Sequence, residues 1–503
     1  MAFSDQRKST GNKPQRLLGS HWYFLFVSIF FVTHGYLENV RLIPFRDIAL
    51  LLVILLVFSL LVFWFFRWLL KTKQKSALFT FLFLLITLFF GVVQDFAERQ
   101  FGNSFFSRIS FLSLLAFVIL FASFFLIRKS RSDFKRIPVF LNLLFAIYII
   151  VDLSAILVEL QKHEKTEKTI FHEPIKISPC DSCAKPPVYL VLLDEYSGTS
   201  SLQKYFNYDN SGFEDSLSQL GFHVIQESHS NYYYTVYSMA SMLNLDYIKD
   251  FKRHGVDDDE GYHKALMMIK NNFVVQQFMQ EGYQVKNYSY FELEKFPAIY
   301  KNDYLPGKIN LIIHKTMYVR LLAQVLNKIG MGRPLVVTSG DWEEEYIKNN
   351  NDMMERVLNE KQDSVPSFTY VHLMMPHEPF TFNSKGERIQ KWVRSSSRNI
   401  EQVDAAYLEY LMYTNKKVYQ FVKQLQSNTN GKAVIMLMSD HAYRGFERKG
   451  DMKLLYSNLN AVYLPGKQYE QFKDGTTNVN QFRILFSALF NHHVPLLKNE
   501  LIP

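Results

Sequence analysis

The chain of 503 residues has a formal net charge of +9, and this charge is unevenly distributed. Residues 1–160 contain 17 basic and 8 acidic residues, whereas residues 161–503 contain 39 of each. Because the excess positive charge lies in the most apolar third of the chain, it is attributed to membrane topology, and nucleic-acid binding is excluded.

The N-terminal third contains long apolar runs. A helix of about 20 residues crosses a bilayer, and five segments are predicted to do so, although the first is short and contains His34. The predicted spans are residues 22–37, 48–66, 77–94, 109–127 and 137–158.

The basic residues that flank these spans predict their orientation. The N-terminal tail, the second connection and the fourth connection hold four, four and five Lys and Arg residues, against two in each of the other connections. The positive-inside rule therefore predicts a multi-pass protein of the inner (plasma) membrane with a cytoplasmic N-terminus. Five crossings would place everything after about residue 160 on the outer face. The first span lacks a small-residue cleavage site, so no signal peptide is expected.

Residues 161–186 are polar and contain prolines, which predicts a linker. This stretch contains the chain's two cysteines, Cys180 and Cys183, in the sequence SPCDSCAK. A C-x-x-C pair is compatible with a redox motif or with half of a zinc site. Since no second pair exists and disulfides persist on the outer face, a structural disulfide is the preferred interpretation.

Beyond the linker, strand-like and helix-like segments alternate. The clearest helical pattern covers residues 405–426. This alternation predicts an α/β sandwich around a mostly parallel sheet. The strand-like segments are VYLVLL at 188–193, FHVIQE near 222, FTYVHLMM at 368–375, AVIMLM at 433–438 and NAVYLP at 460–465.

Carboxylates and imidazoles follow three of these predicted strands. Ligands bind at the carboxyl ends of strands in open parallel sheets, and two Asp with one His suit Zn²⁺ or Mn²⁺. Taken singly, such an Asp is equally a helix N-cap, and such a His equally a loop residue. Their joint appearance at three strand ends is what indicates a metal site. The residues concerned are Asp194, Glu195, His372, His377, Asp440 and His441.

A candidate nucleophile lies in NYYYTVYSMASMLNLDY at residues 231–247. Thr235, Ser238 and Ser241 are spaced three apart, so they share one face of a helix. Thr235 would lie in the first turn, where free N–H groups favour an anion. The alternative is a Thr N-cap followed by small packing residues. A Thr hydroxyl becomes a competent nucleophile when a metal or a base activates it.

The order of these motifs resembles the alkaline phosphatase superfamily. They are a strand ending in Asp, T-x-x-S-x-x-S-x-L, H-x-P-F, and S-D-H after a hydrophobic strand. With a five-span membrane domain at 1–160, the chain is similar to lipid phosphoethanolamine transferases and lipoteichoic acid synthases. The resemblance implies a sulfatase-like catalytic domain at 187–503 with an alkaline phosphatase-like fold.

The same resemblance implies roles for individual residues. It makes Thr235 the nucleophile and a metal ligand, with one divalent ion, Zn or Mn. The other implied ligands are Asp194, Asp440 and His441, with Glu195 replacing Asp194 if the register slips by one. The implied substrate contacts are His377 and, as weaker candidates, His372 and Arg444.

The sequence departs from the family in two respects. Sulfatases need Cys or Ser in a C/S-x-P-x-R setting, but this chain has TVYSM with Met239 in place of the Arg, so sulfate ester hydrolysis is not expected. Two-metal members carry D-x-x-x-H shortly before the D-H pair, and none lies there. His492 and His493 near the C-terminus are compatible with a second site, but the preferred interpretation is a pair that flanks a helix, with a single metal bound.

Three functions are compatible with these residues. The preferred one is a transferase that moves a phospho-head group, phosphoethanolamine or similar, from a membrane phospholipid to an envelope glycolipid or glycan through a threonine intermediate. The second keeps the site but transfers to water, as a phosphodiesterase or phosphatase. The third is a non-catalytic membrane scaffold or sensor.

Overall fold

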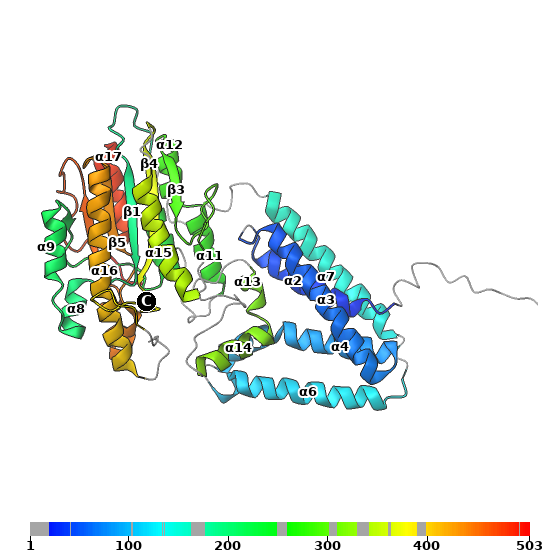
Figure 1. Cartoon of the computed structure of the whole chain (residues 1–503). Helices are drawn as coiled ribbons and strands as arrows, with labels where there is room; N and C mark the ends of the chain where they lie inside the picture. The colour runs from blue at the N-terminus through cyan, green and yellow to red at the C-terminus, as the bar shows by residue number, and fades with distance from the viewer. Residues whose placement is uncertain are drawn as a thin grey trace, which may run out of the picture. The chain divides into compact units, whose positions relative to one another are not determined.

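The structure, a computed structural model, describes most of the chain and forms two compact units (Figure 1). Residues Met1–Glu164 and Asp303–Val337 make the first, here called the helical unit. Residues Lys165–Asn302 and Thr338–Pro503 make the second, here called the α/β unit. The described residues are 20–40, 42–101, 104–132, 134, 136–161, 177–248, 259–300, 309–328, 342–360, 364–389, 399–491 and 493–502.

Every predicted span coincides with helical structure in the helical unit. The helices are α2 (Tyr23–Glu38), α3 (Phe45–Leu70), α4 (Lys73–Leu88), α5 (Phe90–Phe101), α6 (Ile109–Lys129) and α7 (Arg136–Gln161).

The predicted count of five spans is not confirmed. Among the described residues, α3, α6 and α7 are long and apolar enough to cross a membrane. The bent pair α4 and α5, with 48° between its helices, would make a fourth span. The remaining helix, α2, is apolar but has only 16 residues, fewer than the roughly 20 that a crossing needs.

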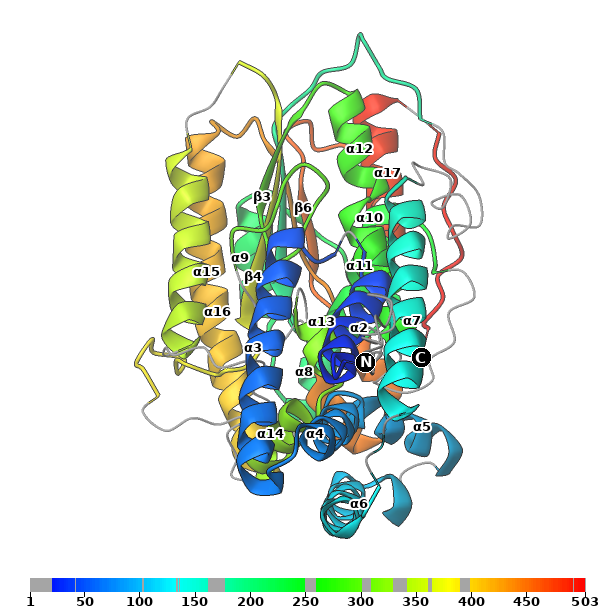
Figure 2. The ribbon, with the colours of Figure 1, turned by 90° about the vertical axis from the view of Figure 1, so that its right-hand side faces the viewer.

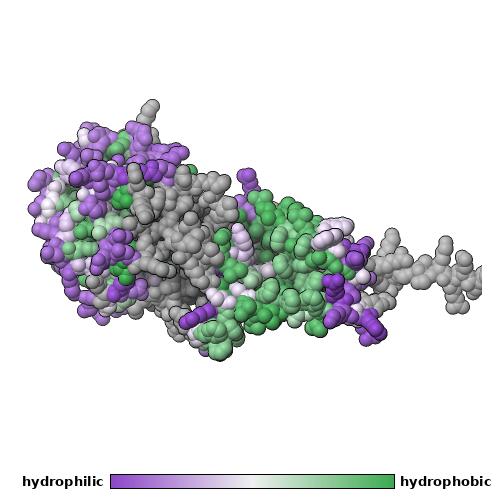
Figure 3. Space-filling model, turned by 60° about the horizontal axis from the view of Figure 1, so that its bottom comes forward, coloured by the Kyte–Doolittle hydropathy of each residue, from purple (hydrophilic) through white to green (hydrophobic). Residues whose placement is uncertain are grey.

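The long helices expose large apolar side chains, such as Trp68 and Leu126. In Figure 3, hydrophobic residues gather over the described surface of the helical unit. Water is a poor solvent for so much contiguous apolar surface, which is the pattern of a lipid-facing surface.

The helical unit also contains a segment from far along the chain. Helices α13 (Asn310–Ile313) and α14 (Met317–Lys328) belong to it. Helix α13 packs against α2, and α14 packs against α4, α5 and α6 (Figure 1). The sequence predicted one continuous domain over 187–503, whereas the contacts group Asp303–Val337 with the N-terminal helices.

Part of the predicted linker can be compared with the structure. Residues 162–176 lie outside the described residues, and residues 177–186 lead into the first strand. Within this stretch, Cys180 and Cys183 form a disulfide, which confirms the prediction.

The α/β unit is built on one six-stranded sheet in the order β2-β6-β5-β1-β4-β3. Strands β5, β1, β4 and β3 are parallel to one another, and β6 is antiparallel to β5, so the sheet is mostly parallel as predicted. Every residue of β1, β4 and β5 is buried, which explains their continuous apolar runs. The strands are β1 (Val188–Asp194), β2 (His223–Val224), β3 (Gln284–Tyr288), β4 (Ser367–Pro376), β5 (Val434–Ser439) and β6 (Asn460–Tyr463).

Helices cover both faces of this sheet. Figure 2 shows α15 (Trp342–Asn359) and α16 (Ile400–Asn428) on one side of it. On the other side lie α10 (Thr235–Asn244), α12 (Phe273–Gln280) and α17 (Asn478–Phe490). The predicted α/β sandwich is therefore confirmed. Its remaining α-helices are α8 (Thr199–Phe206), α9 (Ser211–Gln219) and α11 (Asp259–Lys270).

Candidate active site

The polar residues predicted from the strand ends meet at one edge of the sheet. Strands β5, β1 and β4 are parallel neighbours, so their carboxyl ends lie together. Asp194 is the last residue of β1, and Asp440 directly follows β5. His372 lies within β4, paired in register with Leu192 of β1.

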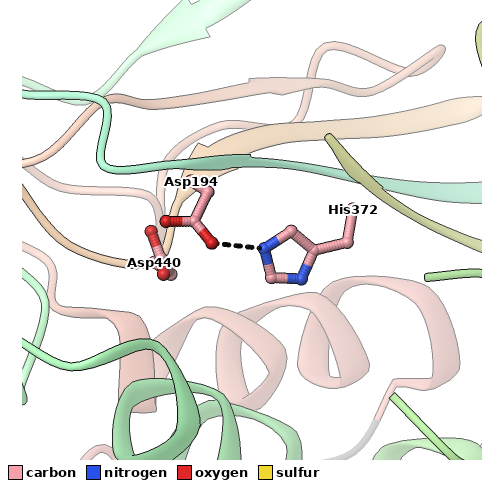
Figure 4. A group of neighbouring side chains, drawn as sticks. All are labelled: Asp194, His372 and Asp440. Carbon is pink, nitrogen blue, oxygen red and sulfur yellow. Dashed lines mark ion pairs between the residues drawn. The ribbon is translucent and has the colours of Figure 1, made fainter. Parts of the chain in front are cut away.

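Asp194, His372 and Asp440 form a compact cluster at this edge (Figure 4). Each offers one ligand atom, and these atoms lie within 4.8 Å of one another. His372 Nε2 lies 3.3 Å from Asp194 Oδ2, and all three side chains are buried.

The cluster has the properties of a cation site. Among the described residues, both carboxylate oxygens of Asp194, Oδ2 of Asp440 and Nε2 of His372 have no hydrogen-bond partner, and their nearest polar contacts are imidazole–carboxylate pairs at 3.3 Å. Leaving such buried polar atoms unsatisfied is costly. A divalent ion would satisfy them together, and this oxygen and nitrogen donor set suits Zn²⁺ or Mn²⁺.

The two carboxyl groups respond to burial in opposite ways. Burial alone would raise the pKa of Asp194, but the imidazoles of His377, His372 and His441 lower it below its usual value. Burial and the charge of Asp194 together raise the pKa of Asp440. Two neighbouring buried carboxyls with diverging pKa values favour one shared proton, and a bound cation would let both ionise.

His441 lies beside this cluster with its tautomer fixed. Its Nδ1 is 2.8 Å from the Ala442 carbonyl oxygen and must donate to it, so Nε2 carries the lone pair. That Nε2 lies 3.1 Å from Thr235 Oγ1 and 3.3 Å from Asp440 Oδ2. His441 can therefore accept the Thr235 proton or act as a further ligand.

Thr235 is the first residue of α10 and is buried. The Ser238 hydroxyl, one turn later, donates to the Asp440 carbonyl at 2.6 Å, which ties α10 to the end of β5. Free N–H groups at a helix N-terminus favour an anion. The start of α10 thus presents the Thr235 hydroxyl next to groups suited to a phosphoryl oxygen.

A second group of contacts joins Arg444 to the site. Its Nη2 donates to His377 Nε2 at 2.7 Å, and its Nε donates to Glu195 Oε1 at 2.5 Å. Burial would raise the pKa of Glu195, but the Arg444 guanidinium lowers it. Glu195 has a left-handed φ of +61°, uncommon for a residue with a side chain, and its N–H donates to Asp440 Oδ1. Glu195, the alternative first ligand, is thus turned towards Arg444.

All seven predicted site residues lie at this sheet edge, but their grouping differs from the prediction. The sequence assigned His372 to substrate contact, and the structure places its Nε2 in the cluster with Asp194 and Asp440. His441 and Thr235, expected as ligands, form the adjacent hydrogen-bonded pair.

Sequence reasoning missed Tyr370, whose hydroxyl lies 2.9 Å from His372 Nδ1. The available signal was the i, i+2 spacing, which puts both side chains on one face of β4. Of the alternative second-site pair, His492 lies outside the described residues and His493 is exposed.

Comparison with known proteins shows the family of this chain. The Sulfatase family model matches residues 203–485. No curated protein matches the sequence.

The chain is also similar to several solved structures. One is the integral membrane protein lipooligosaccharide phosphoethanolamine transferase A from Neisseria meningitidis, with 12 % identity, a TM-score of 0.37 and coverage of 93 % of this chain and 95 % of that one. Another is the periplasmic domain of EcEptC from Escherichia coli, with 12 % identity, a TM-score of 0.38 and coverage of 63 % and 86 %. A third is the phosphonate monoester hydrolase of Agrobacterium radiobacter, with 12 % identity, a TM-score of 0.38 and coverage of 61 % and 74 %. Since the family model spans more than half of the chain, the protein belongs to the Sulfatase family.

Proposed function

We propose that this protein is a metal-dependent transferase with a covalent threonine intermediate. It moves a phospho-head group, phosphoethanolamine or similar, from a membrane phospholipid to an envelope glycolipid or glycan. The observation that carries the proposal is the pairing of Thr235 Oγ1 with His441 Nε2 beside the Asp194, His372 and Asp440 cluster. A hydroxyl next to a lone-pair nitrogen and a cation site is an activated nucleophile.

In this proposal Asp194, Asp440 and His372 hold the metal, with His441 and Thr235 beside it. When bound, Zn²⁺ or Mn²⁺ would supply Lewis-acid chemistry, favouring ionisation of the Thr235 hydroxyl and neutralising charge on the phosphoryl oxygens. A sulfate ester is not the expected substrate, because TVYSM lacks the residues that a sulfatase oxidises.

The side chains then divide the chemistry among them. Thr235 Oγ1 bonds to phosphorus, its proton passes to His441 Nε2, and the lipid alcohol leaves and takes up that proton. The acceptor hydroxyl next attacks the phosphorus of the adduct and passes its proton to His441 Nε2, the bond between Thr235 Oγ1 and phosphorus breaks, and Thr235 Oγ1 takes up that proton. Arg444, held by Glu195 and His377, donates to phosphoryl oxygens, and a guanidinium is well suited to this bidentate task.

The proposed location is the inner membrane, with a cytoplasmic N-terminus and the α/β unit on the outer face. The charge pattern of the N-terminal third supports this orientation. Membrane phospholipids are the phosphodiester donors available there, and no nucleotide is required.

A trapping experiment tests the proposal. The full chain, loaded with Zn²⁺ in phosphatidylethanolamine vesicles without acceptor, should gain a phosphoethanolamine group on the peptide that contains Thr235, measured by mass spectrometry. Thr235→Ala should abolish the adduct. Ser241→Ala is the matched control, because Ser241 lies on the same helix face but donates to the Asp246 carbonyl.

Each other outcome has a definite meaning. An adduct that persists in Thr235→Ala contradicts the nucleophile. Release of free phosphoethanolamine with no transfer to any glycolipid indicates the phosphodiesterase alternative. Absence of both metal binding and adduct indicates the scaffold alternative.

A further inference from the structure

The segment α13–α14, residues 309–328, packs closely against α2 and α5 within the helical unit. A Cβ atom at Gly35 of α2 would lie 2.7 Å from Ile312 Cγ2, and one at Gly91 of α5 would lie 2.7 Å from Lys315 Cα. The Gly91 N–H also donates to the Lys315 carbonyl at 2.7 Å. Two glycines on two helices thus make room for this segment, and one free helix N–H is satisfied by it.

Ion pairs and apolar contacts also hold residues 309–328 against the N-terminal helices. Lys315 Nζ lies 2.9 Å from Glu38 Oε2, and Arg320 Nη2 lies 2.9 Å from Asp95 Oδ1. Arg320 and Asp95 are only 17 % and 20 % exposed, so their attraction is less screened than that of a surface pair. Met317 packs against an apolar cluster formed by α5 and α6. Close packing at two glycines, two ion pairs and an apolar contact therefore all hold residues 309–328 against the N-terminal helices.

The chain before this segment forms an aromatic wall at the candidate active site. Phe291 and Tyr290 lie 5.7 Å and 6.4 Å from His372 between ring centroids. Tyr300 lies 6.2 Å from Tyr290. Only eight residues, 301–308, then separate Tyr300 from residue 309, and such a length spans at most about 30 Å when fully extended.

The chain after the segment returns to the same wall. Tyr346 of α15 stacks on Tyr290 at 6.4 Å. The Asn350 side chain accepts a hydrogen bond from the backbone N–H of Met374 in β4 at 2.9 Å. The segment therefore leaves from the wall beside His372 and comes back to it. The 162–176 stretch of the linker is almost twice as long as 301–308 and constrains the wall less.

From this arrangement we infer that residues 309–328 are a second membrane anchor of the α/β unit. The anchor ties the aromatic wall of the active site to the helical unit, independently of the 161–186 linker. It thereby restricts the site to phosphodiesters carried by the membrane. The restriction on donors rests on the proposed function, whereas the anchoring does not.

Cleavage of the linker tests the anchoring. A protease site is inserted within residues 165–172 of the full chain, the membranes are treated with the protease, and the tagged N-terminal fragment is recovered in detergent. The C-terminal fragment should co-purify from the otherwise unchanged chain. Arg320→Glu should lose most of it, and Arg320→Glu with Asp95→Arg should recover it.

Glycine variants provide an independent check. Gly91→Ala should also release the fragment, because its Cβ meets backbone atoms of Lys315. Gly212→Ala is the matched control, because a Cβ there meets nothing within 4 Å. Release from the unchanged chain would overturn the inference. Undiminished recovery in both Arg320→Glu and Gly91→Ala would overturn it as well.

The restriction on donors has its own assay. Arg320→Glu should lower the turnover of vesicle phosphatidylethanolamine by about tenfold or more. Its hydrolysis of the soluble diester bis(p-nitrophenyl) phosphate should stay unchanged. Arg320→Glu with Asp95→Arg should restore the turnover of the lipid. Equal loss of both activities would overturn the restriction. If the unchanged chain acts on neither substrate, the proposed function fails, and co-purification still decides the anchoring.

Discussion

Thr235 Oγ1 lies 3.1 Å from His441 Nε2, and the Ala442 carbonyl accepts the proton on the other ring nitrogen of His441. The backbone thus determines which nitrogen faces the hydroxyl. This is the geometry that a base acting on a threonine requires.

His441→Ala should reduce turnover by about 10²–10⁴-fold, the range for removal of a general base. His223→Ala is the matched control, because His223 lies in the outermost strand, β2, and contacts Tyr469 and the Phe472 carbonyl. Rates of adduct formation measure both effects. Adduct formation by His441→Ala at the original rate would exclude His441 as the base.

Asp440→Asn should separate stability from metal binding. Asn resembles the protonated carboxyl that burial and Asp194 favour, and its Oδ1 can still accept from the N–H groups of Glu195 and His441. We expect the metal-free protein to gain about 1 kcal/mol of unfolding free energy, the scale of one satisfied hydrogen bond.

The same variant should lose stabilisation by metal. For the unchanged chain, Zn²⁺ at 100 times its dissociation constant should add about 2.7 kcal/mol, which is measurable as a rise in Tm. A full Zn²⁺ response in Asp440→Asn would show that this carboxylate is not a ligand.

Tyr370→Phe should weaken metal binding without touching a ligand. The Tyr370 hydroxyl holds Nδ1 of His372, and loss of such a partner costs about 10–100-fold in metal affinity. Competition with a chelator measures the change. Tyr463→Phe, which removes a hydroxyl bonded to the Gly431 carbonyl, should leave the affinity unaltered. An unaltered affinity in Tyr370→Phe would mean that His372 does not bind the metal.

Arg444→Lys should raise KM for the phosphodiester about tenfold or more. A lysine keeps the charge but cannot hold Glu195 and His377 with one planar fork. Arg448→Lys is the control, because Arg448 pairs with Asp404 instead. Steady-state kinetics with a soluble phosphodiester compares them, and equal KM values would remove Arg444 from substrate binding.

The candidate site residues could be selected from the sequence because the central strands are buried on both faces. VYLVLL and AVIMLM appear as unbroken apolar runs, and the polar residues that follow them stand out. Parallel neighbours bring such ends together, so the convergence of Asp194 and Asp440 was predictable. Whether His372 or His441 lies nearest to both carboxylates was not, because that depends on the register of β4 against β1.

Other features left weaker traces in the sequence. Strand β3 has the sequence QVKNY and is an outermost strand of the sheet, so it lacks an apolar run. The predicted span 77–94 contains the bend between α4 and α5, and no proline marks it. The return of 309–328 to the N-terminal helices depends on Gly35, Gly91, Glu38 and Asp95, more than 200 residues away, and local patterns carry no such information.

The position of α13–α14 in the chain also orders biosynthesis. In the part of the chain that the structure describes, the central strand β1 pairs only with β4 and β5, and both emerge from the ribosome after residue 366. The segment 309–328 is therefore synthesised before the sheet can form. The helices that it packs against, α2 and α5, have already been synthesised by then. A secreted version made of residues 187–503 would carry this apolar segment without the glycines of α2 and α5 against which it packs, and it would tend to aggregate. Replacing Asp303–Val337 with a short polar loop should make that version soluble.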